Sequence, residues 1–359
     1  MKRILLFVLL ISASPAWSQD VLPMLDFNNL MKSFENGIFR SIALQPVREY
    51  EAGDNVVGYY DFRNNLMVHN GSNPEQLANI EAEYTVSDFL LTWKIATTLN
   101  MWDNGEKRTL TFQVGQYKVT DSLVVFQDLR YNTVSVYYNG EVHELIASSL
   151  DLHMPEFIGE NIIAFRDNGN FYKVFWRGQI YELDVWHKPY VFHGGTDMVA
   201  FNDPINGTFA IFENGQFLDV ESFHMNGYKV GNGLVAYENL NGDLMMYKDG
   251  EISQLTNFGA STWAVRDNVV YWVENGFAYA NIDGERIEVA KYEPKDFELK
   301  NSTLAFRNLM GGVSAVQDGK IIEITNQLDA PFEIHGNSVL VELFNKSYIV
   351  LQNGRKYQQ

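Results

Sequence analysis

The sequence predicts an all-β fold assembled from nine or ten copies of a short four-stranded sheet. Three observations lead to this prediction. A glycine-centred turn recurs every 34–38 residues, the flanking residues alternate between apolar and polar, and no helical 3.6-residue period persists beyond the N-terminal segment. A helix is expected at most as a short piece near residues 26–34. The recurring glycines are Gly37, Gly71, Gly105, Gly140, Gly178, Gly215, Gly250, Gly284, Gly319 and Gly354.

Residues 1–18 differ from the rest of the chain. Two basic residues precede an apolar run from Ile4 to Ile11, and small residues stand at Ala16 and Ser18. This three-part pattern is typical of a secretory signal peptide, which we expect to be cut before Gln19. The run is too short to span a bilayer, and no later segment is apolar enough to do so. The chain has no cysteine, so neither a lipoprotein anchor nor a disulfide is expected. We expect export to the periplasm or the cell exterior.

Each copy of the repeat reads as four short strands in about 35 residues. The first strand has an aromatic residue followed by alternation, as in "YTVSD" (84–88), and the second is apolar, as in "LVVFQD" (123–128). The third carries an aromatic residue three positions before the glycine, and the fourth ends in an apolar residue five positions after it; Tyr137 and Leu145 do so around Gly140. Asn-Gly and Asp-Gly pairs between strands three and four indicate two-residue hairpins, because such turns need positive φ.

The segment "NIIAFRDNGNFYKVFWRGQIYEL" (161–183) resembles a blade of the TolB or WD40 type of repeat. It has a strand ending in Ala and an aromatic residue, then a second strand, a turn glycine and a strand that closes on leucine. The resemblance covers almost all of the chain after residue 18, and it implies a β-propeller of nine or ten four-stranded blades. The Trp-Asp signature of true WD40 repeats is missing, so no particular family is indicated.

We expect one repeat domain over residues 19–359. Nine complete units run from 50 to 359, and a degenerate first unit, 21–44, lacks a clear first strand. That unit is related to the others, because "DFNNLM" (26–31) echoes "DFRNNLM" (61–67). Two smaller propellers or an open curved array are the alternatives for so many units. The chain has no linker rich in Pro, Gly or Ser between units, which favours one continuous array.

The formal net charge is −18. It becomes −20 without the two basic residues of the signal peptide (−18 − 2 = −20). A field of this sign disfavours nucleic acid and anionic membrane surfaces, and it favours cations or basic partners. The charge does not fix an oligomeric state.

No catalytic signature is present: the chain has no G-x-S-x-G elbow, no H-E-x-x-H, no P-loop and no cysteine nucleophile. We therefore predict no catalytic residue and no cofactor, and leave any metal open. Carboxylates that follow the second strand are interpreted as turn residues bonded to their own backbone, with a ring of acids used in binding as the alternative. They are Asp61, Asp128, Asp167 and Asp203.

Histidine gives the sharpest candidate site. Three consecutive units place a histidine early in the connection to the next unit, 12–14 residues before the second-strand aromatic, and the two longest repeat steps fall in the same region. Imidazole is a common metal ligand, so a ligand or metal site is one hypothesis. The other is that these residues lie on peripheral loops and pack or face water. The candidate ligand-binding residues are His153, His187, His193, His224, Trp186 and Tyr190.

The leading hypothesis is an exported, non-enzymatic β-propeller that binds or scaffolds a protein or glycan partner. The alternative is an envelope enzyme, a glycan hydrolase or lyase, with its site at the mouth of the central channel. Converging carboxylates or imidazoles with shifted pKa values in that channel would favour the enzyme, whereas apolar or scattered polar residues would favour the binding platform. Neither a nucleic-acid partner nor a membrane span is expected.

Overall fold

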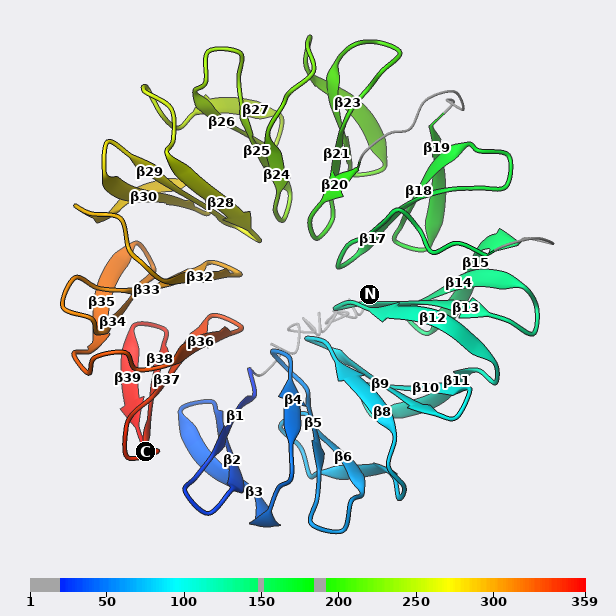
Figure 1. Ribbon diagram of the computed structural model, residues 1–359, viewed down its shortest axis with the longest axis vertical. Helices are drawn as coiled ribbons and strands as arrows, with labels where there is room; N and C mark the ends of the chain where they lie inside the picture. The colour runs from blue at the N-terminus through cyan, green and yellow to red at the C-terminus, as the bar shows by residue number, and fades with distance from the viewer. Residues whose placement is uncertain (1–19, 148–151, 184–191) are drawn as a thin grey trace, which may run out of the picture.

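The computed structural model describes residues 20–147, 152–183 and 192–359. Over these residues the chain forms ten separate antiparallel sheets arranged around a central axis (Figure 1). Nine sheets have four strands in sequence order and the first has three, and the described residues contain no helix. The protein is therefore an all-β propeller with ten blades in one ring. The alternatives of two smaller propellers or an open array are excluded. The blades are numbered 1–10 in chain order.

Within each blade the strands lie in sequence order from the axis of the ring to its rim. Blade 1 consists of β1 (Leu22–Leu25), β2 (Leu30–Glu35) and β3 (Ile38–Pro46). The innermost strands of blades 2–10 are β4 (Tyr50–Ala52), β8 (Glu83–Val86), β12 (Val114–Val119), β16 (Phe157–Ile158), β20 (His193–Gly194), β24 (Tyr228–Val230), β28 (Thr262–Arg266), β32 (Phe297–Lys300) and β36 (Phe332–His335). The second strands are β5 (Val57–Tyr60), β9 (Leu90–Ile95), β13 (Leu123–Asp128), β17 (Ile162–Arg166), β21 (Val199–Asn202), β25 (Leu234–Glu238), β29 (Val269–Glu274), β33 (Thr303–Arg307) and β37 (Ser338–Glu342).

The outer half of each blade completes the sheet. The third strands of blades 2–10 are β6 (Leu66–His69), β10 (Thr98–Asp103), β14 (Thr133–Tyr138), β18 (Tyr172–Trp176), β22 (Phe209–Glu213), β26 (Leu244–Lys248), β30 (Phe277–Ile282), β34 (Val313–Gln317) and β38 (Tyr348–Gln352). The outermost strands are β7 (Glu75–Ala78), β11 (Glu106–Thr111), β15 (Glu141–Ala147), β19 (Gln179–Leu183), β23 (Gln216–Glu221), β27 (Glu251–Gln254), β31 (Glu285–Ala290), β35 (Lys320–Thr325) and β39 (Arg355–Gln358).

Antiparallel order divides the turns between the two faces of the ring. Turns that join the first strand to the second, and the third to the fourth, lie on one face, here called the hairpin face. Turns that join the second strand to the third, together with the connections between blades, lie on the other, here called the connection face. Residues at the same place in successive blades therefore lie on the same face.

The third-to-fourth hairpins follow the sequence prediction. Asn139 and Gly140 have φ values of 46° and 87°, the left-handed pair that a type I′ turn requires, and eight other blades show two positive φ values at the same place. Blade 2 differs, because β6 ends at His69 and β7 begins at Glu75, so that Gly71 lies in a five-residue loop. The prediction of a two-residue hairpin is wrong at this turn.

Residues 26–34 form a turn and part of β2, so the short helix considered for this segment does not form. The Asp26 carboxylate accepts the backbone N–H groups of Asn28 and Leu30 at 2.8 and 3.0 Å. Asp61 holds the equivalent turn of blade 2 in the same way. By this correspondence β1 is a second strand. The predicted turn role of the carboxylates after the second strand is confirmed for Asp61, Asp128, Asp167 and Asp203.

The apolar core lies between neighbouring blades, and the same packing closes the ring. Phe34 of blade 1 is fully buried, and its ring centroid lies 5.0 Å from that of Tyr357 in blade 10. The Tyr348 hydroxyl donates a hydrogen bond to the Leu25 carbonyl at 2.8 Å. Each described sheet is built from strands adjacent in sequence. Blades 1 and 10 are therefore joined by side-chain packing and not by a shared strand.

Candidate functional site

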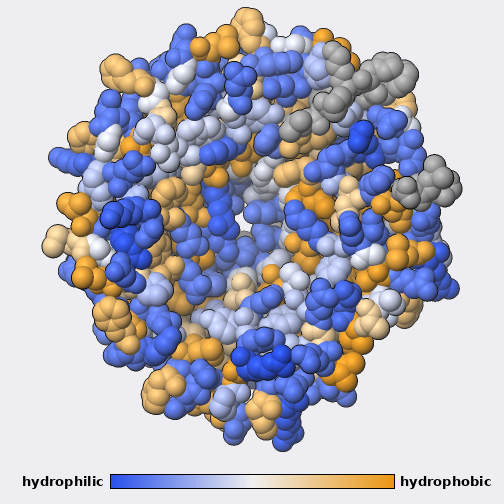
Figure 2. All heavy atoms as spheres, in the orientation of Figure 1, coloured by the Kyte–Doolittle hydropathy of each residue, from blue (hydrophilic) through white to orange (hydrophobic). Residues whose placement is uncertain are grey.

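The first-to-second turns of the hairpin face surround the central channel, and their backbones are hydrogen-bonded to one another. The Asn55 N–H donates to the Asp88 carbonyl at 3.0 Å, and the Asn232 N–H donates to the Asp267 carbonyl at 2.8 Å. The same bond joins Val21 to Asp54, Asn161 to Thr196 and Asn268 to Asn301. These bonds hold equivalent residues at one height around the channel. Hydrophilic atoms line the hollow at the centre of Figure 2.

Acidic residues occupy the same position of this turn in six blades, five of them consecutive. This set, here called the collar, comprises Asp20, Asp54, Asp88, Asp121, Glu160 and Asp267. The carboxylates also bond to neighbouring turns. Asp88 Oδ1 accepts the Asp54 N–H at 3.0 Å, and Asp121 Oδ1 accepts the Asp88 N–H at 3.3 Å. The interblade bonds thus bring carboxylates of adjacent blades close to one another.

One lysine joins two distant parts of the ring at the collar. Lys300 Nζ, in blade 9, lies 2.5 Å from Asp54 Oδ1 in blade 2 and 3.0 Å from Asp88 Oδ1 in blade 3. The neighbouring Asn301 amide donates to Asp54 Oδ2 at 3.1 Å. Burial lowers the pKa of Lys300, but the two carboxylates outweigh burial and raise it above its ordinary value. Lys300 is therefore a charged ammonium that neutralises part of the collar.

Three further collar carboxylates, those of Asp20, Asp121 and Glu160, hold protons more tightly than ordinary acids because their pKa values are raised. Burial, together with the charges of Asp88 and Glu160, raises the pKa of Asp121 to about 7. Burial, together with the charge of Asp54, raises the pKa of Asp20 to about 6. Burial also raises the pKa of Glu160. Like charges that are shielded from water disfavour ionisation. A further cation bound at the collar would therefore stabilise the ionised carboxylates.

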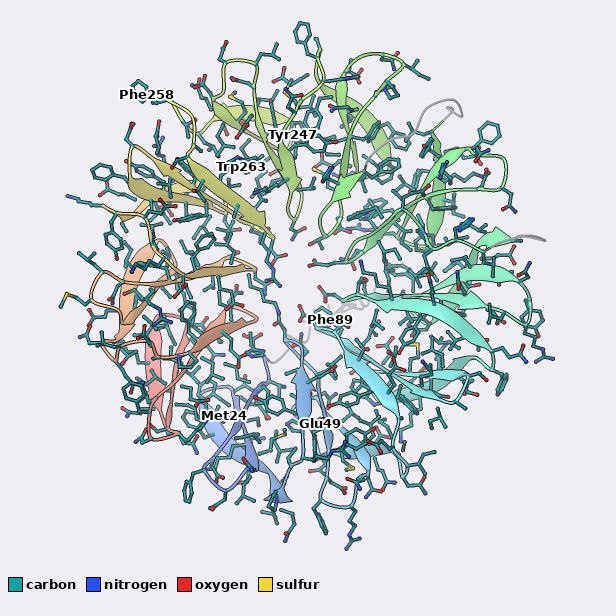
Figure 3. The ribbon with its side chains drawn as sticks, viewed as in Figure 1. Met24, Glu49, Phe89, Tyr247, Phe258 and Trp263 are labelled. Carbon is teal, nitrogen blue, oxygen red and sulfur yellow. The ribbon has the colours of Figure 1, made fainter. Side chains whose placement is uncertain are left out.

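A cavity of about 570 Å³ opens beside the collar on the hairpin face. The first-to-second turns contribute acidic, amide and hydroxyl groups to its lining, and the third-to-fourth turns contribute an aromatic ring and a guanidinium. Figure 3 places Phe89, at the end of blade 3 nearest the axis, close to the centre of the ring. The lining residues are Phe89, Leu90, Asp103, Asp121, Ser122, Tyr138, Asn139, Asn161, Arg177 and Asp197. Asp121 thus belongs to both the collar and the cavity.

Two of the cavity acids are fixed by aromatic donors. Asp103 Oδ2 accepts a hydrogen bond from the Tyr137 hydroxyl at 2.6 Å, and Asp197 Oδ1 accepts one from the Trp176 indole N–H at 3.0 Å. The carboxylates are therefore oriented before any ligand arrives, and each retains lone pairs for one. Within the described residues, no group of three or more His, Asp or Glu side chains is arranged to hold a metal ion. The site suits ammonium, guanidinium and hydroxyl groups.

Ten blades in one ring, with this turn repeated around the channel, match a known family. The model of the 10-bladed beta propeller domain covers residues 15–357. The chain belongs to this family. No match is found among curated proteins.

This ten-bladed propeller is also similar to solved structures, at low identity. Kluyveromyces lactis Hsv2p is 12% identical, with 66% of this chain and 92% of that chain covered and a TM-score of 0.29. Porphyromonas gingivalis PorZ, a surface component of the type-IX secretion system, is 8% identical, with 95% of this chain and 59% of that chain covered and a TM-score of 0.27. The computationally designed protein Ika8 is 14% identical, with 71% and 93% covered and a TM-score of 0.30. Similarity at this level does not bear on function.

The histidines singled out from the sequence have different surroundings in this ten-bladed propeller. His153 lies on the connection face and lines a cavity of about 290 Å³ with Glu156 and Arg166. The His193 ring, in β20, packs edge-on against Tyr228 at 4.8 Å. His224 Nε2 lies 2.8 Å from the Asp203 carbonyl. His187, Trp186 and Tyr190 lie outside the described residues.

The collar was not singled out from the sequence, although its signal is present there. Asp54, Asp88, Asp121 and Asp267 each end one of the aromatic-led first strands in the repeat. An acid that recurs at one register of an inner strand faces its counterparts around a closed ring, because equivalent positions share a height. The pairing of Lys300 with Asp54 has no comparable signal, because 246 residues separate them.

Proposed function

We propose that this ten-bladed propeller is an exported, non-enzymatic binding module that holds a positively charged group of a protein or glycan partner. The charged group would enter the cavity beside the collar and pair with Asp121. The observation that carries the proposal is the excess of carboxylates over cations around the channel, beside a cavity with two oriented acids. A net charge of −18 supports the same choice, since it attracts basic partners over a distance. Export rests on the N-terminal sequence pattern.

The test is a pull-down from envelope extract, paired with an array of peptides and glycans. A collar variant, Asp121→Asn with Glu160→Gln, removes two carboxylates and keeps their shapes. A matched control variant, Asp249→Asn with Glu251→Gln, removes two exposed carboxylates from the outer hairpin of blade 7. We expect binders enriched in lysine, arginine or amino sugars that the wild type and the control retain and the collar variant loses. Equal retention by both variants would remove the collar from the function.

A second candidate, an envelope glycan hydrolase or lyase, meets the criterion stated above for an enzyme, because carboxylates with raised pKa values converge at the channel. Asp121, whose pKa burial and neighbouring charges raise to about 7, would be protonated in about half the molecules at neutral pH and lines the cavity. A general acid needs these properties. Incubation with envelope polysaccharides, followed by an assay for new reducing ends, tests this candidate. Cleavage by the wild type that Asp121→Asn abolishes would support the hydrolase, and absence of cleavage by the wild type would leave the binding module.

A further inference from the structure

Apolar side chains project from equivalent turns on the connection face, the face opposite the collar. Six second-to-third turns share one five-residue hydrogen-bonding pattern, seen for example at residues 26–30 and 61–65. In five of these turns the second residue is a large apolar side chain that is more than half exposed, and in the sixth it is Asn168. The five residues, here called the tips, are Phe27 (78% exposed), Phe62 (56%), Leu240 (69%), Leu309 (75%) and Phe344 (80%). Polar residues are the usual choice in such turns, so the pattern calls for a functional account.

Four of the tips lie on consecutive blades, 9, 10, 1 and 2, which run from orange through red to blue in Figure 1. Neighbouring exposed apolar residues on the same face extend this set. The resulting surface, here called the apolar sector, comprises Phe27, Leu44, Phe62, Ile80, Leu309, Met310, Leu328 and Phe344. All eight side chains are at least half exposed. Neither cavity described above is lined by them.

The shape of this surface favours a flat and deformable target. Equivalent turns lie at the same height along the ring axis, so the tips of adjacent blades define a plane. They project from separate turns on separate blades. A protein partner of ordinary affinity needs a contiguous, shape-complementary area, whereas a lipid surface accepts isolated apolar projections. Phenylalanine and leucine are common on the apolar face of segments that lie in the membrane interface.

The charge of the four turns that carry the tips fits a lipid surface without net charge. The four turns, residues 26–30, 61–65, 308–312 and 343–347, contain Asp26, Asp61, Arg63 and Lys346, which sum to zero (−2 + 2 = 0). The whole chain carries −18, so these four turns are a neutral part of an acidic protein, and the acids beside the other sector residues, Glu81 and Asp329, lie outside the turns. The Arg63 guanidinium lies 5.0 Å from the Phe62 ring centroid. The aliphatic part of the Arg63 side chain can enter the membrane interface beside the Phe62 ring, while the guanidinium stays among the lipid headgroups.

We propose that the apolar sector docks the propeller onto a zwitterionic lipid surface. The tips of blades 9, 10, 1 and 2 enter the interface, and the collar on the opposite face stays open to its partner. Among the described residues, no helix is long and apolar enough to cross a membrane. Docking would therefore be peripheral and reversible.

The test is co-sedimentation of the full chain with phosphatidylcholine vesicles. A sector variant, Phe27→Ser with Phe62→Ser and Phe344→Ser, is compared with a control, Phe112→Ser with Phe223→Ser and Phe258→Ser. The control replaces three exposed phenylalanines outside the sector, among them Phe258 at the rim in Figure 3. We expect the wild type and the control to sediment with vesicles, and the ratio of bound to free protein to fall at least tenfold in the sector variant. Because all replaced rings are exposed, circular dichroism should show every variant folded.

Three outcomes would overturn the proposal. The wild type could fail to sediment with any vesicle, or the sector variant could sediment as well as the wild type. The wild type could instead be a dimer that the sector variant converts to a monomer, which would make a second copy of this chain the occupant. Vesicles with added phosphatidylglycerol give a further check, because the acidic protein should bind them less tightly than phosphatidylcholine alone.

Discussion

Lys300 shows how a single residue decides the state of the collar. Its side chain is 12% exposed, and those of its partners Asp54 and Asp88 are 7% and 17% exposed. At such burial two adjacent carboxylates are tolerated because a cation lies between them. The ammonium therefore acts as the resident counter-ion of the collar, and it shows which chemistry a ligand needs there.

Replacement of Lys300 by methionine is expected to lower the free energy of unfolding by about 3–5 kcal/mol at pH 7, because Asp54 and Asp88 lose their cation while buried. The loss should shrink at acidic pH as the carboxylates take up protons. Urea unfolding at pH 7 and pH 5 measures both effects. Lys94→Met, which breaks an exposed pair with Glu83, should cost less than about 1 kcal/mol. Equal losses of unfolding free energy in the two variants would show that the bridge from Lys300 stabilises the fold no more than an exposed ion pair does.

The Asp121→Asn variant is expected to be more stable than the wild type at alkaline pH, by a margin that grows as pH rises. The pKa of Asp121 is raised to about 7 in the folded protein. Its contribution to stability is therefore fully present below its unfolded pKa, near 4, and is lost as pH rises through 7. Asparagine cannot ionise, so the variant should exceed the wild type by about 1–3 kcal/mol at pH 8 and by less at pH 5. Thermal melts at both pH values check this, with Asp249→Asn as the exposed control. A gain of the same size at both pH values would contradict it.

Neighbouring blades share a recurring polar contact between their third strands. An acid at the end of one third strand accepts a hydrogen bond from a side chain in the third strand of the next blade. The Tyr137 hydroxyl donates to Asp103 at 2.6 Å, and the Tyr247 hydroxyl donates to Glu213 at 3.0 Å. In both pairs the residues lie 34 positions apart. A polar pair spaced by one repeat period is thus a contact that can be predicted from a repeat sequence.

The most buried version of this contact joins blades 1 and 2. Glu35 is 1% exposed; its carboxylate accepts a hydrogen bond from the Ser33 hydroxyl and lies 2.8 Å from His69 Nε2. Burial raises the pKa of Glu35, but His69 and Ser33 outweigh burial and hold it below its ordinary value. The group therefore stabilises the fold above the unfolded pKa of glutamate, and that stabilisation is lost as pH falls through the folded pKa.

Glu35→Gln is expected to lower the free energy of unfolding by about 1.5–3 kcal/mol at pH 7, because buried hydrogen bonds lose their charge. The difference from the wild type should narrow at pH 3.5, which lies below the ordinary pKa of glutamate, because the stability gained from the ionised folded carboxylate declines as pH falls. Denaturant midpoints at the two pH values measure it. Glu141→Gln on the exposed start of β15 is the control and should have little effect at either pH. A difference independent of pH would place the effect in packing alone.

The whole ring depends on contacts that no single repeat contains. The hairpin pairs of every blade except blade 2, the strand order and the carboxylate-capped turns were predicted, because each is local and recurs from blade to blade. The number of blades in one ring, the bridge from Lys300 and the seam between Phe34 and Tyr357 could not be predicted, because they arise only when the chain closes on itself. The collar stands between these cases, since its acids recur in register but meet only across a channel.

Phe34→Ala, at the seam between blades 1 and 10, is expected to lower the free energy of unfolding by about 3–5 kcal/mol. Phe34 is fully buried, and the seam has no shared strand to compensate. Limited proteolysis should then cut first in blades 1 and 10. Phe258→Ala, at a side chain 80% exposed, should change stability by less than about 0.5 kcal/mol. First cuts in the middle of the chain would contradict a role for the seam in closing the ring.

The affinity of the protein for a trilysine peptide, measured by calorimetry at low and at physiological salt, tests most directly whether the collar is the binding site. We expect the wild type and the Asp249→Asn/Glu251→Gln control to bind the peptide, with affinity that falls as salt rises. The Asp121→Asn/Glu160→Gln collar variant should bind at least tenfold more weakly. Equal affinity in the collar and control variants would show that the cation binds to the acidic surface in general, and the collar would then not be the site.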